Sequence, residues 1–368
     1  MKVLLVSLQK RGGGALDLLG FSGGLCENEF KHEVVLSSYN EFCDRLSDNE
    51  YRKVIKVKTY SGGMASFLGA LVLLRPIRFM RSVVKMRPDM IHILDFHAWM
   101  IFLYLARPFC GFKMIYSPQD DPFSPKESNP PLMNFLEKFF VRHADEVIAY
   151  SKVVGTGLEK HISKKVVVMP LGVYPRVYGE FEKNFTGEGT LNILFLGRIE
   201  PYKGVDTLID AYRILKDKNS DVCLTIAGRG NLPAGSAKAV KDLGIALKNY
   251  WLSNEEIGSL IGSADVIAAP YKEITQSAVV MTAISYLVPV IVTDVGSLSD
   301  YVKDGYNGFV VSSGDAPAVA ESVLKLLKNR DLVSQMSQNQ KTVCETFSWG
   351  NVSKKAIEVY GSLREAVK

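Results

Sequence analysis

Short apolar runs alternate with helix-length stretches along most of the chain. In the first half, six runs have the length and composition of buried strands: Val3–Ser7, His32–Ser37, Met90–Leu94, Lys113–Ser117, Glu146–Tyr150 and Lys165–Met169. In the second half there are five: Leu191–Leu196, Val222–Ala227, Val266–Ala269, Pro289–Thr293 and Gly308–Val311. Strands separated by helix-length segments favour parallel, doubly wound sheets. The pattern predicts an α/β protein with two such halves.

A stretch rich in proline and glycine separates the two halves. Pro170, Gly172 and Pro175 punctuate it, as is typical of a connection between domains. A chain of 368 residues is long enough for two domains of ordinary size. We therefore expect one domain over residues 1–172 and a second over residues 173–346.

The stretch Leu191–Tyr212 says most about chemistry. A buried-type strand ends at Gly197-Arg198, Lys203-Gly204 follows five residues after the arginine, and an amphipathic helix comes next. Open α/β sheets bind ligands at the carboxyl ends of their strands, where helix N-termini favour anions. Two cations at that edge suit a diphosphate. The alternative is that Arg198 and Lys203 are solvated loop charges.

A second segment, Ala264–Val311, carries a family pattern. It reads as a short apolar strand, a polar loop, a helix at Ala278–Leu287 and a second buried strand. The motif positions are Ala283, Pro289-Val290-Ile291, Thr293-Asp294-Val295-Gly296, Asp300 and Asp304-Gly305…Gly308. With these motifs the chain resembles the retaining glycosyltransferases of family 4, which have the GT-B fold. The resemblance covers nearly the whole chain and is most specific over residues 191–311.

The resemblance implies two Rossmann-like domains that face one another across a cleft. The second would hold a nucleotide-sugar donor, and the first would approach a glycan or lipid-linked acceptor. Arg198 and Lys203 would stabilise the departing diphosphate without a divalent metal. The segment from Phe347 would begin a helix, within residues 347–368, that crosses back onto the first domain.

The resemblance also places a set of residues around the donor. These are Gly13, Gly14, Gly197, Gly228, Gly230, Trp251, Ile274, Thr275, Gln276, Ser277, Ala278 and Thr282. The glycines after the first strand read equally well as a flexible loop. Trp251 could instead be a residue packed in the core, and we favour that interpretation.

The chain departs from the family pattern at two places. Ile274 and Thr282 stand where the family has glutamates. Glu273 lies one residue early and is not assumed to substitute, because one step along a loop redirects the side chain. Gln119, followed by Asp120, stands where many relatives have a histidine and an aspartate. Glutamine can hydrogen-bond but cannot titrate, so the position would serve to hold the sugar while the leaving phosphate takes the proton.

Composition narrows the remaining possibilities. Hydrophobic residues make up 47% of the chain and charged residues 23%, which describes a globular protein. The five cysteines and five histidines show no metal-ligand spacing, so we expect no protein-bound metal. The resemblance implies that the nucleotide sugar is a co-substrate and that no cofactor is needed. The apolar run at Val3–Ser7 is too short for a signal peptide, so we expect a cytoplasmic protein.

A basic segment in the first half of the chain allows two interpretations. The apolar run Met64–Leu74 is too short to span a bilayer and precedes four cations, Arg75, Arg78, Arg81 and Lys85. This pattern fits a peripheral contact with anionic lipid on the inner face of the cell membrane. It also fits an ordinary Rossmann helix. No basic–aromatic motif of a nucleic-acid-binding module appears, so we expect no nucleic-acid partner.

Three functions fit these observations. The first is a retaining hexosyltransferase that uses a nucleotide sugar. The second is a non-catalytic nucleotide-sugar or glycan-binding protein, which the absent glutamates would favour. The third is a sugar-nucleotide epimerase on the same scaffold.

Overall fold

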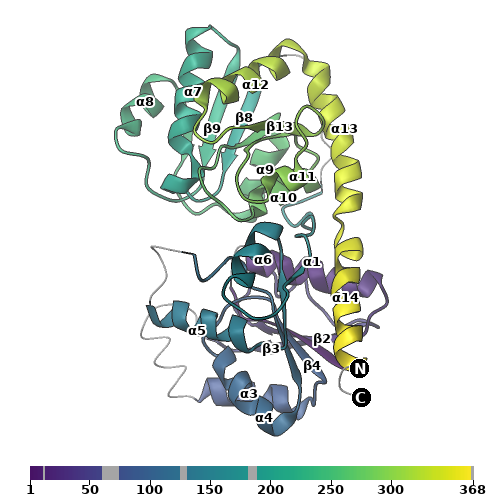
Figure 1. The fold of residues 1–368 in the computed structure, drawn as a ribbon. Helices are drawn as coiled ribbons and strands as arrows, with labels where there is room; N and C mark the ends of the chain where they lie inside the picture. Colours follow the sequence, from purple (N-terminus) through teal and green to yellow (C-terminus); the bar gives the residue numbers. More distant parts are fainter. Residues whose placement is uncertain (11–12, 60–73, 125–130, 181–188, 366–368) are drawn as a thin grey trace. The chain divides into compact units, whose positions relative to one another are not determined.

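The computed structural model describes residues 1–10, 13–59, 74–124, 131–180 and 189–365 (Figure 1). Within it the chain divides into two compact units. Unit 1 comprises Met1–Gly172 together with Phe347–Lys368, and unit 2 comprises Val173–Thr346. Unit 1 is therefore built from both ends of the chain.

Unit 1 contains a seven-stranded parallel sheet in the order β3-β2-β1-β4-β5-β6-β7. Its strands are β1 (Val3–Ser7), β2 (His32–Ser37), β3 (Arg52–Val57), β4 (Met90–Ile93), β5 (Lys113–Tyr116), β6 (Glu146–Ala149) and β7 (Val167–Val168). From β1 to β3 the successive strands are added on one side of β1, and from β4 onward they are added on the other side. The boundary between β1 and β4 is therefore the topological switch point of an open α/β sheet. The predicted parallel sheet is confirmed.

Helices cover both faces of this sheet. They are α1 (Gly13–Glu27), α3 (Arg75–Lys85), α4 (Met100–Cys110), α5 (Pro131–His143), α6 (Lys152–Glu159) and α14 (Trp349–Glu365). Ile91 and Ile93 of β4 join one core with side chains of α3 to α6. His92, between them, contacts Phe21 of α1 and Tyr360 of α14. Because successive strand residues point to opposite faces, α1 and α14 cover the other face.

Trp349 fixes the start of α14 in unit 1. A Cβ atom added at Gly20 or Gly172 would lie 2.0 or 2.3 Å from the Trp349 ring, and one at Gly24 would lie 2.2 Å from its carbonyl oxygen. Only glycine leaves room for the indole at Gly20 and Gly172, and for the Trp349 backbone at Gly24. The Phe21 ring meets it edge-on, with centroids 5.8 Å apart.

Unit 2 repeats the architecture with six parallel strands in the order β10-β9-β8-β11-β12-β13. The strands are β8 (Leu191–Leu196), β9 (Val222–Ala227), β10 (Ala246–Lys248), β11 (Val266–Ala269), β12 (Val290–Thr293) and β13 (Gly308–Val311). The helices are η1 (Pro201–Lys203), α7 (Val205–Asp217), α8 (Ser236–Asp242), α9 (Asn254–Ser263), α10 (Ala278–Ser285), α11 (Leu298–Tyr301), α12 (Ala316–Lys328) and α13 (Arg330–Thr346). The switch point lies between β8 and β11.

Two strands and several element ends differ from the expectations. The apolar-run pattern misses β3 and β10, each at one edge of its sheet, and it extends five strands, β4, β5, β6, β7 and β12, by one to three residues each. The helix predicted to end at Leu287 ends at Ser285, because Leu287 adopts a left-handed backbone with φ 58°.

Candidate active site

The loops at the carboxyl edge of unit 2 are packed in backbone contact. Gly204, between η1 and α7, has φ 67°, and a Cβ there would lie 1.8 Å from the carbonyl oxygen of Pro270 after β11. Gly228, after β9, has φ 140°, and its Cβ would lie 2.0 Å from the Gly197 carbonyl oxygen. Both positions need a left-handed or close backbone that only glycine supplies cheaply. The loops after β8, β9 and β11 therefore form one surface at the switch point.

Lys203 is a buried cation within that surface. It is only 8% exposed. Its ammonium lies 3.8 Å from the centre of the Tyr271 ring and 5.3 Å from that of Tyr202. Among the described residues no carboxylate lies within ion-pair distance of it. A charge held against aromatic faces without an acid is prepared to receive an anion.

Arg198 lies at the same edge but in a different state. Its side chain is exposed, with Nη1 2.8 Å from Glu200 Oε1. Nη2 donates to the Tyr202 hydroxyl at 3.2 Å. An exposed ion pair of this kind stabilises by about 0–1 kcal/mol, so little opposes its exchange for a ligand anion.

Ser277 begins α10 and connects it to Lys203. Its hydroxyl accepts from the backbone N–H of Val280 at 3.3 Å, which is an N-cap. It also donates to the Tyr271 hydroxyl at 3.3 Å. Tyr271 thus bridges the lysine and the start of α10. The structure brings together two segments, around Lys203 and Ser277, that the sequence only suggested were neighbours.

Residues that follow β12 contact the backbone of the Ile274–Ala278 loop. Ser297 donates from its hydroxyl and its backbone N–H to the Thr275 carbonyl oxygen, at 2.7 and 3.2 Å. Gly296, with φ 62°, would place a Cβ 1.9 Å from the Ile274 carbonyl oxygen. These contacts order the backbone ahead of α10. Gln276 and Ala278 are half-buried at the same edge.

Thr282 lies one turn into α10 and is buried. Its carbonyl oxygen accepts from the Ser285 hydroxyl at 2.8 Å. A short buried threonine reaches less far than the glutamate that the family pattern has there. A ribose contact at this position would need a different partner.

The turn after β9 is held by Asn249. The Asn249 side chain accepts from the Gly230 N–H and donates to the Gly230 carbonyl oxygen, each at 3.0 Å. Trp251 follows β10 and is 56% exposed. The packing interpretation of Trp251 was therefore wrong. An exposed indole next to the Gly228–Gly230 turn offers a flat face for stacking.

Unit 1 presents its own loop cluster at the β1/β4 switch point. Gly13 and Gly14 are the first residues of α1, whereas Gly12 lies outside the described residues. The preceding turn is held by Asp95, after β4, which accepts from the Ser7 hydroxyl and from the N–H groups of Leu8 and Gln9. Burial raises the pKa of the Asp95 carboxyl to about 6. Sequence reasoning missed Asp95, although an acid inside an apolar run is a signal.

Gln119 is fixed by a second residue that the sequence analysis missed. Its Nε2 donates to Asp17 Oδ2 at 2.7 Å and to the Leu94 carbonyl oxygen at 3.2 Å. Asp17 is fully buried in α1. With two acceptors on its nitrogen, the amide has a defined orientation. Asp120, the next residue, is half-buried in the same loop.

His97, also after β4, adds a neutral imidazole to this edge. Its Nδ1 accepts from the backbone N–H of Trp99 at 3.2 Å, which leaves the proton on Nε2. Burial, with a smaller contribution from the Lys10 charge, lowers its pKa to about 4. The histidine is therefore uncharged at neutral pH.

Comparison with known proteins decides the family. Residues 12–172 match the family described as "Glycosyl transferase 4-like domain", and residues 179–343 match "Glycosyl transferases group 1". The chain belongs to the family-4 glycosyltransferases of the GT-B fold.

Individual relatives of this glycosyltransferase are distant. An uncharacterized glycosyltransferase of Methanocaldococcus jannaschii is 27% identical over 63% of the chain, and the match spans 63% of that protein's own length. A D-inositol 3-phosphate glycosyltransferase of Actinosynnema mirum is 24% identical over 78% of the chain and 76% of its own length. The structure of Anabaena HepE in complex with UDP and glucose superposes with a TM-score of 0.72, at 17% identity, over 98% of this chain and 100% of that one.

The basic segment of this glycosyltransferase is α3, which packs as an ordinary helix of the layer. Phe79 and Val83 are buried in the core, whereas Arg78, Arg81 and Lys85 are exposed. Arg75 is half-buried and donates to the Thr59 carbonyl oxygen at 2.8 Å. The run Met64–Leu74 lies outside the described residues except for Leu74. In the described ranges, no helix combines the length and the apolar character needed to cross a bilayer.

Proposed function

We propose that this glycosyltransferase transfers a hexose from a nucleotide-sugar donor to a glycan or lipid-linked saccharide, with retention of anomeric configuration. The observation that carries the proposal is the Lys203 ammonium, which is buried at the β8/β11 switch point with no acid among the described residues beside it. Open α/β sheets bind phosphates at such points. Similarity to a protein that binds UDP and glucose supports a uridine nucleotide as the first donor to test.

In the proposed reaction the bond between the anomeric carbon and the diphosphate oxygen breaks, and the acceptor hydroxyl oxygen bonds to the same face of that carbon. The acceptor proton passes to the departing phosphate oxygen. Lys203 and Arg198 stabilise the charge that grows on the diphosphate, which is where preorganised charges accelerate a reaction. The N–H groups at the start of α10, near Ser277, add to this stabilisation.

The remaining site residues position the substrates. We propose that Trp251 stacks on the base and that the turns at Gly197, Gly228 and Gly230 let the donor approach the backbone. In unit 1, Gln119 hydrogen-bonds a hydroxyl of the transferred sugar and Asp120 contacts the sugar or the acceptor. Because glutamine does not titrate, the departing phosphate acts as the base. Lys203 and Arg198 supply the positive charge on the diphosphate, so the proposed reaction needs no divalent metal.

A membrane-bound acceptor would require unit 1 to reach a lipid surface. We propose that the exposed cations of α3 contact anionic headgroups, each contributing about 1 kcal/mol. The enzyme would then work at the cytoplasmic face of the membrane. Replacement of the exposed Arg78, Arg81 and Lys85 by glutamine should release the protein from anionic vesicles without lowering transfer to a water-soluble acceptor. Arg75 is kept in this variant because it donates to the Thr59 carbonyl oxygen. Binding that ignores both salt and lipid charge would contradict this.

A panel of nucleotide sugars tests the proposed activity. We expect nucleotide release that depends on an added acceptor, and a product whose anomeric configuration, read by proton NMR, matches the donor. Binding without turnover would instead indicate a non-catalytic nucleotide-sugar-binding protein, which the buried Thr282 favours. Conversion of the sugar without an acceptor would indicate an epimerase.

A further inference from the structure

Helix α4 is apolar on every side although it lies in an outer layer of unit 1. Its sequence, MIFLYLARPFC, contains one charged residue, Arg107. Leu103 and Met100 are buried in the core of unit 1. On the outward side Phe109 is 90% exposed and Leu105 is 61% exposed. A surface helix normally carries polar residues there, so an all-round apolar helix indicates an apolar neighbour.

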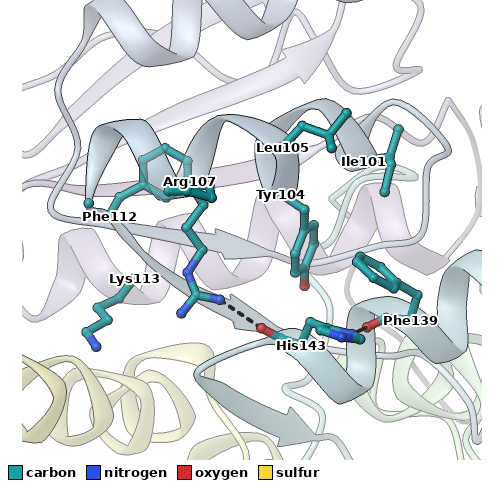
Figure 2. A pocket seen from close by; sticks show the side chains of 10 residues that line it. Ile101, Tyr104, Leu105, Arg107, Phe112, Lys113, Phe139 and His143 are labelled. Carbon is teal, nitrogen blue, oxygen red and sulfur yellow. Dashed lines mark hydrogen bonds between the residues drawn. The ribbon is translucent and has the colours of Figure 1, made fainter.

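Helix α5 continues the apolar surface. Leu132 and Phe135 are exposed, three residues apart and therefore on one side of the helix. Between α4 and α5 lies an open groove of about 460 Å³ (Figure 2). Ile101, Leu105 and Phe139 contribute its apolar walls. Contiguous exposed apolar side chains of this kind mark contact sites for a membrane or a protein.

The polar groups of the groove are occupied by one another. Arg107 reaches across from α4 and donates to the His143 carbonyl oxygen at 2.9 Å (Figure 2). Its Nη2 lies 2.6 Å from Asp145, which also pairs with Lys113 at 3.4 Å. Two cations share one acid, so the rim carries a net positive charge. The groove therefore suits an apolar occupant bordered by negative charge.

The sequence around α4 has the same sign. Between residues 74 and 113 there are seven lysines and arginines against two acids, Asp89 and Asp95, and Asp95 is buried. Helix α3 packs beside α4 in the same layer, with Arg78, Arg81 and Lys85 exposed. An apolar centre with a basic border is the complement of a bilayer whose headgroups are anionic.

We propose that the α4–α5 surface inserts into the headgroup region of an anionic lipid bilayer, with Phe109, Leu105 and Phe135 among the acyl chains. This contact is hydrophobic and adds to the electrostatic contact proposed for α3. The contact would place unit 1, which approaches the acceptor in the proposed function, at the lipid surface. Only this consequence rests on the proposed function. Vesicle binding itself requires no turnover.

Flotation with vesicles tests the surface directly. The vesicles contain phosphatidylcholine alone, or phosphatidylcholine and phosphatidylglycerol in equal parts. The test variant is Leu105→Ser with Phe109→Ser, and its matched control is Leu247→Ser, which removes an exposed leucine from β10 of unit 2. We expect the partition coefficient onto anionic vesicles to fall about tenfold in the test variant, equal to about 1.4 kcal/mol, and to stay unchanged in the control.

A spectroscopic readout separates insertion from surface adsorption. In Phe109→Trp the added emission should shift to the blue with anionic vesicles and be quenched by lipids brominated along the acyl chain. Leu247→Trp should show neither effect. Equal flotation of the serine variant and the wild type would overturn the proposal. So would self-association, detected by sedimentation, that the serine variant loses while neither protein floats, because the occupant would then be a second copy of the chain. Absence of glycosyl transfer in a protein that floats as expected would contradict the proposed function alone.

Discussion

The ammonium of Lys203 lies 3.8 Å from the centre of the Tyr271 ring, and the Tyr271 hydroxyl meets the Ser277 hydroxyl at the start of α10. One tyrosine thus supports a buried cation and a helix N-cap. The aromatic face compensates part of the cost of burying the charge but leaves the N–H donors of lysine free to turn toward an anion. The charge is therefore positioned before a ligand arrives.

Removal of either cation at this edge should slow catalysis. We expect Lys203→Ala and Arg198→Ala each to lower kcat about 10²–10³-fold, the scale seen when one preorganised donor to a developing anion is removed. Lys272→Ala is the matched control, because Lys272 lies in the loop after β11 but pairs with Asp206. Steady-state kinetics with circular dichroism checks the result. Near-normal turnover by either variant would contradict the assigned role.

Asp17 should act on catalysis through Gln119. Replacing Asp17 by asparagine allows the Gln119 amide to turn, so we expect kcat/KM to fall together with that of Gln119→Ala. In the double variant the two losses should not add, because the interaction is already absent. A double-mutant cycle measures this coupling. Additive losses with a lowered melting temperature would show that Asp17 serves stability only.

Transfer should not depend on a divalent metal. In the described part of the chain, no group of three or more His, Cys, Asp or Glu side chains is arranged to hold a metal ion. We expect full activity after dialysis against EDTA, with donor binding unchanged by calorimetry. Activity that disappears and returns with magnesium or manganese would refute metal independence.

Acid should destabilise unit 1 and spare unit 2. All five histidines lie in unit 1. Burial lowers the pKa of His32 and His97 to about 4 and that of His92 to about 3. Their stabilising effect is complete above the unfolded pKa of about 6.5 and is lost as pH falls toward these values. Asp95, with a pKa raised to about 6, acts in the opposite direction below pH 6 and offsets one histidine.

Three lowered histidine pKa values oppose one raised carboxyl pKa, so the free energy of unfolding of unit 1 should fall as the pH drops below about 6.5. Calorimetry at pH 7.5 and 5.5 measures it. Tryptophan fluorescence assigns the transition to a unit. In Trp251→Phe the remaining tryptophans, Trp99 and Trp349, both lie in unit 1, so their fluorescence follows the unfolding of unit 1 alone. The unit 1 transition should move to lower temperature on acidification by more than the unit 2 transition. Equal shifts would contradict the assignment to the buried histidines.

The buried strands were predictable because both of their faces are apolar. The edge strands β7 and β13 were predicted as well, whereas the edge strands β3 and β10 were not. In β3, Arg52, Lys53 and Lys56 interrupt the valines and isoleucine, since an edge strand exposes part of each face. In β10, three residues are too few to show a pattern. The signal that sequence reasoning uses is the hydrophobic period, and both strands lack it.

The site was predictable where a motif is local. Gly197-Arg198 and Lys203-Gly204 precede a helix, and the structure places them after the carboxyl end of β8, as expected. That this end lies at the switch point of the sheet follows from the strand order. The partners of these residues were not predictable. Tyr271 is 68 residues from Lys203, and Asp17 is 102 residues from Gln119. Such pairs are set by strand order, which the sequence of one strand and its loop does not specify.

Unit 1 is interrupted by unit 2, and this affects how the protein is made. Gly20, Gly24 and Gly172 leave the ribosome well before Trp349, which they surround in the finished unit. Synthesis at about 5–20 residues per second leaves the space beside these three glycines without its tryptophan for roughly ten seconds or more. Unit 2 can complete its sheet during that time, because all its strands precede Trp349. Assembly of unit 1 therefore has to finish after translation has passed α14.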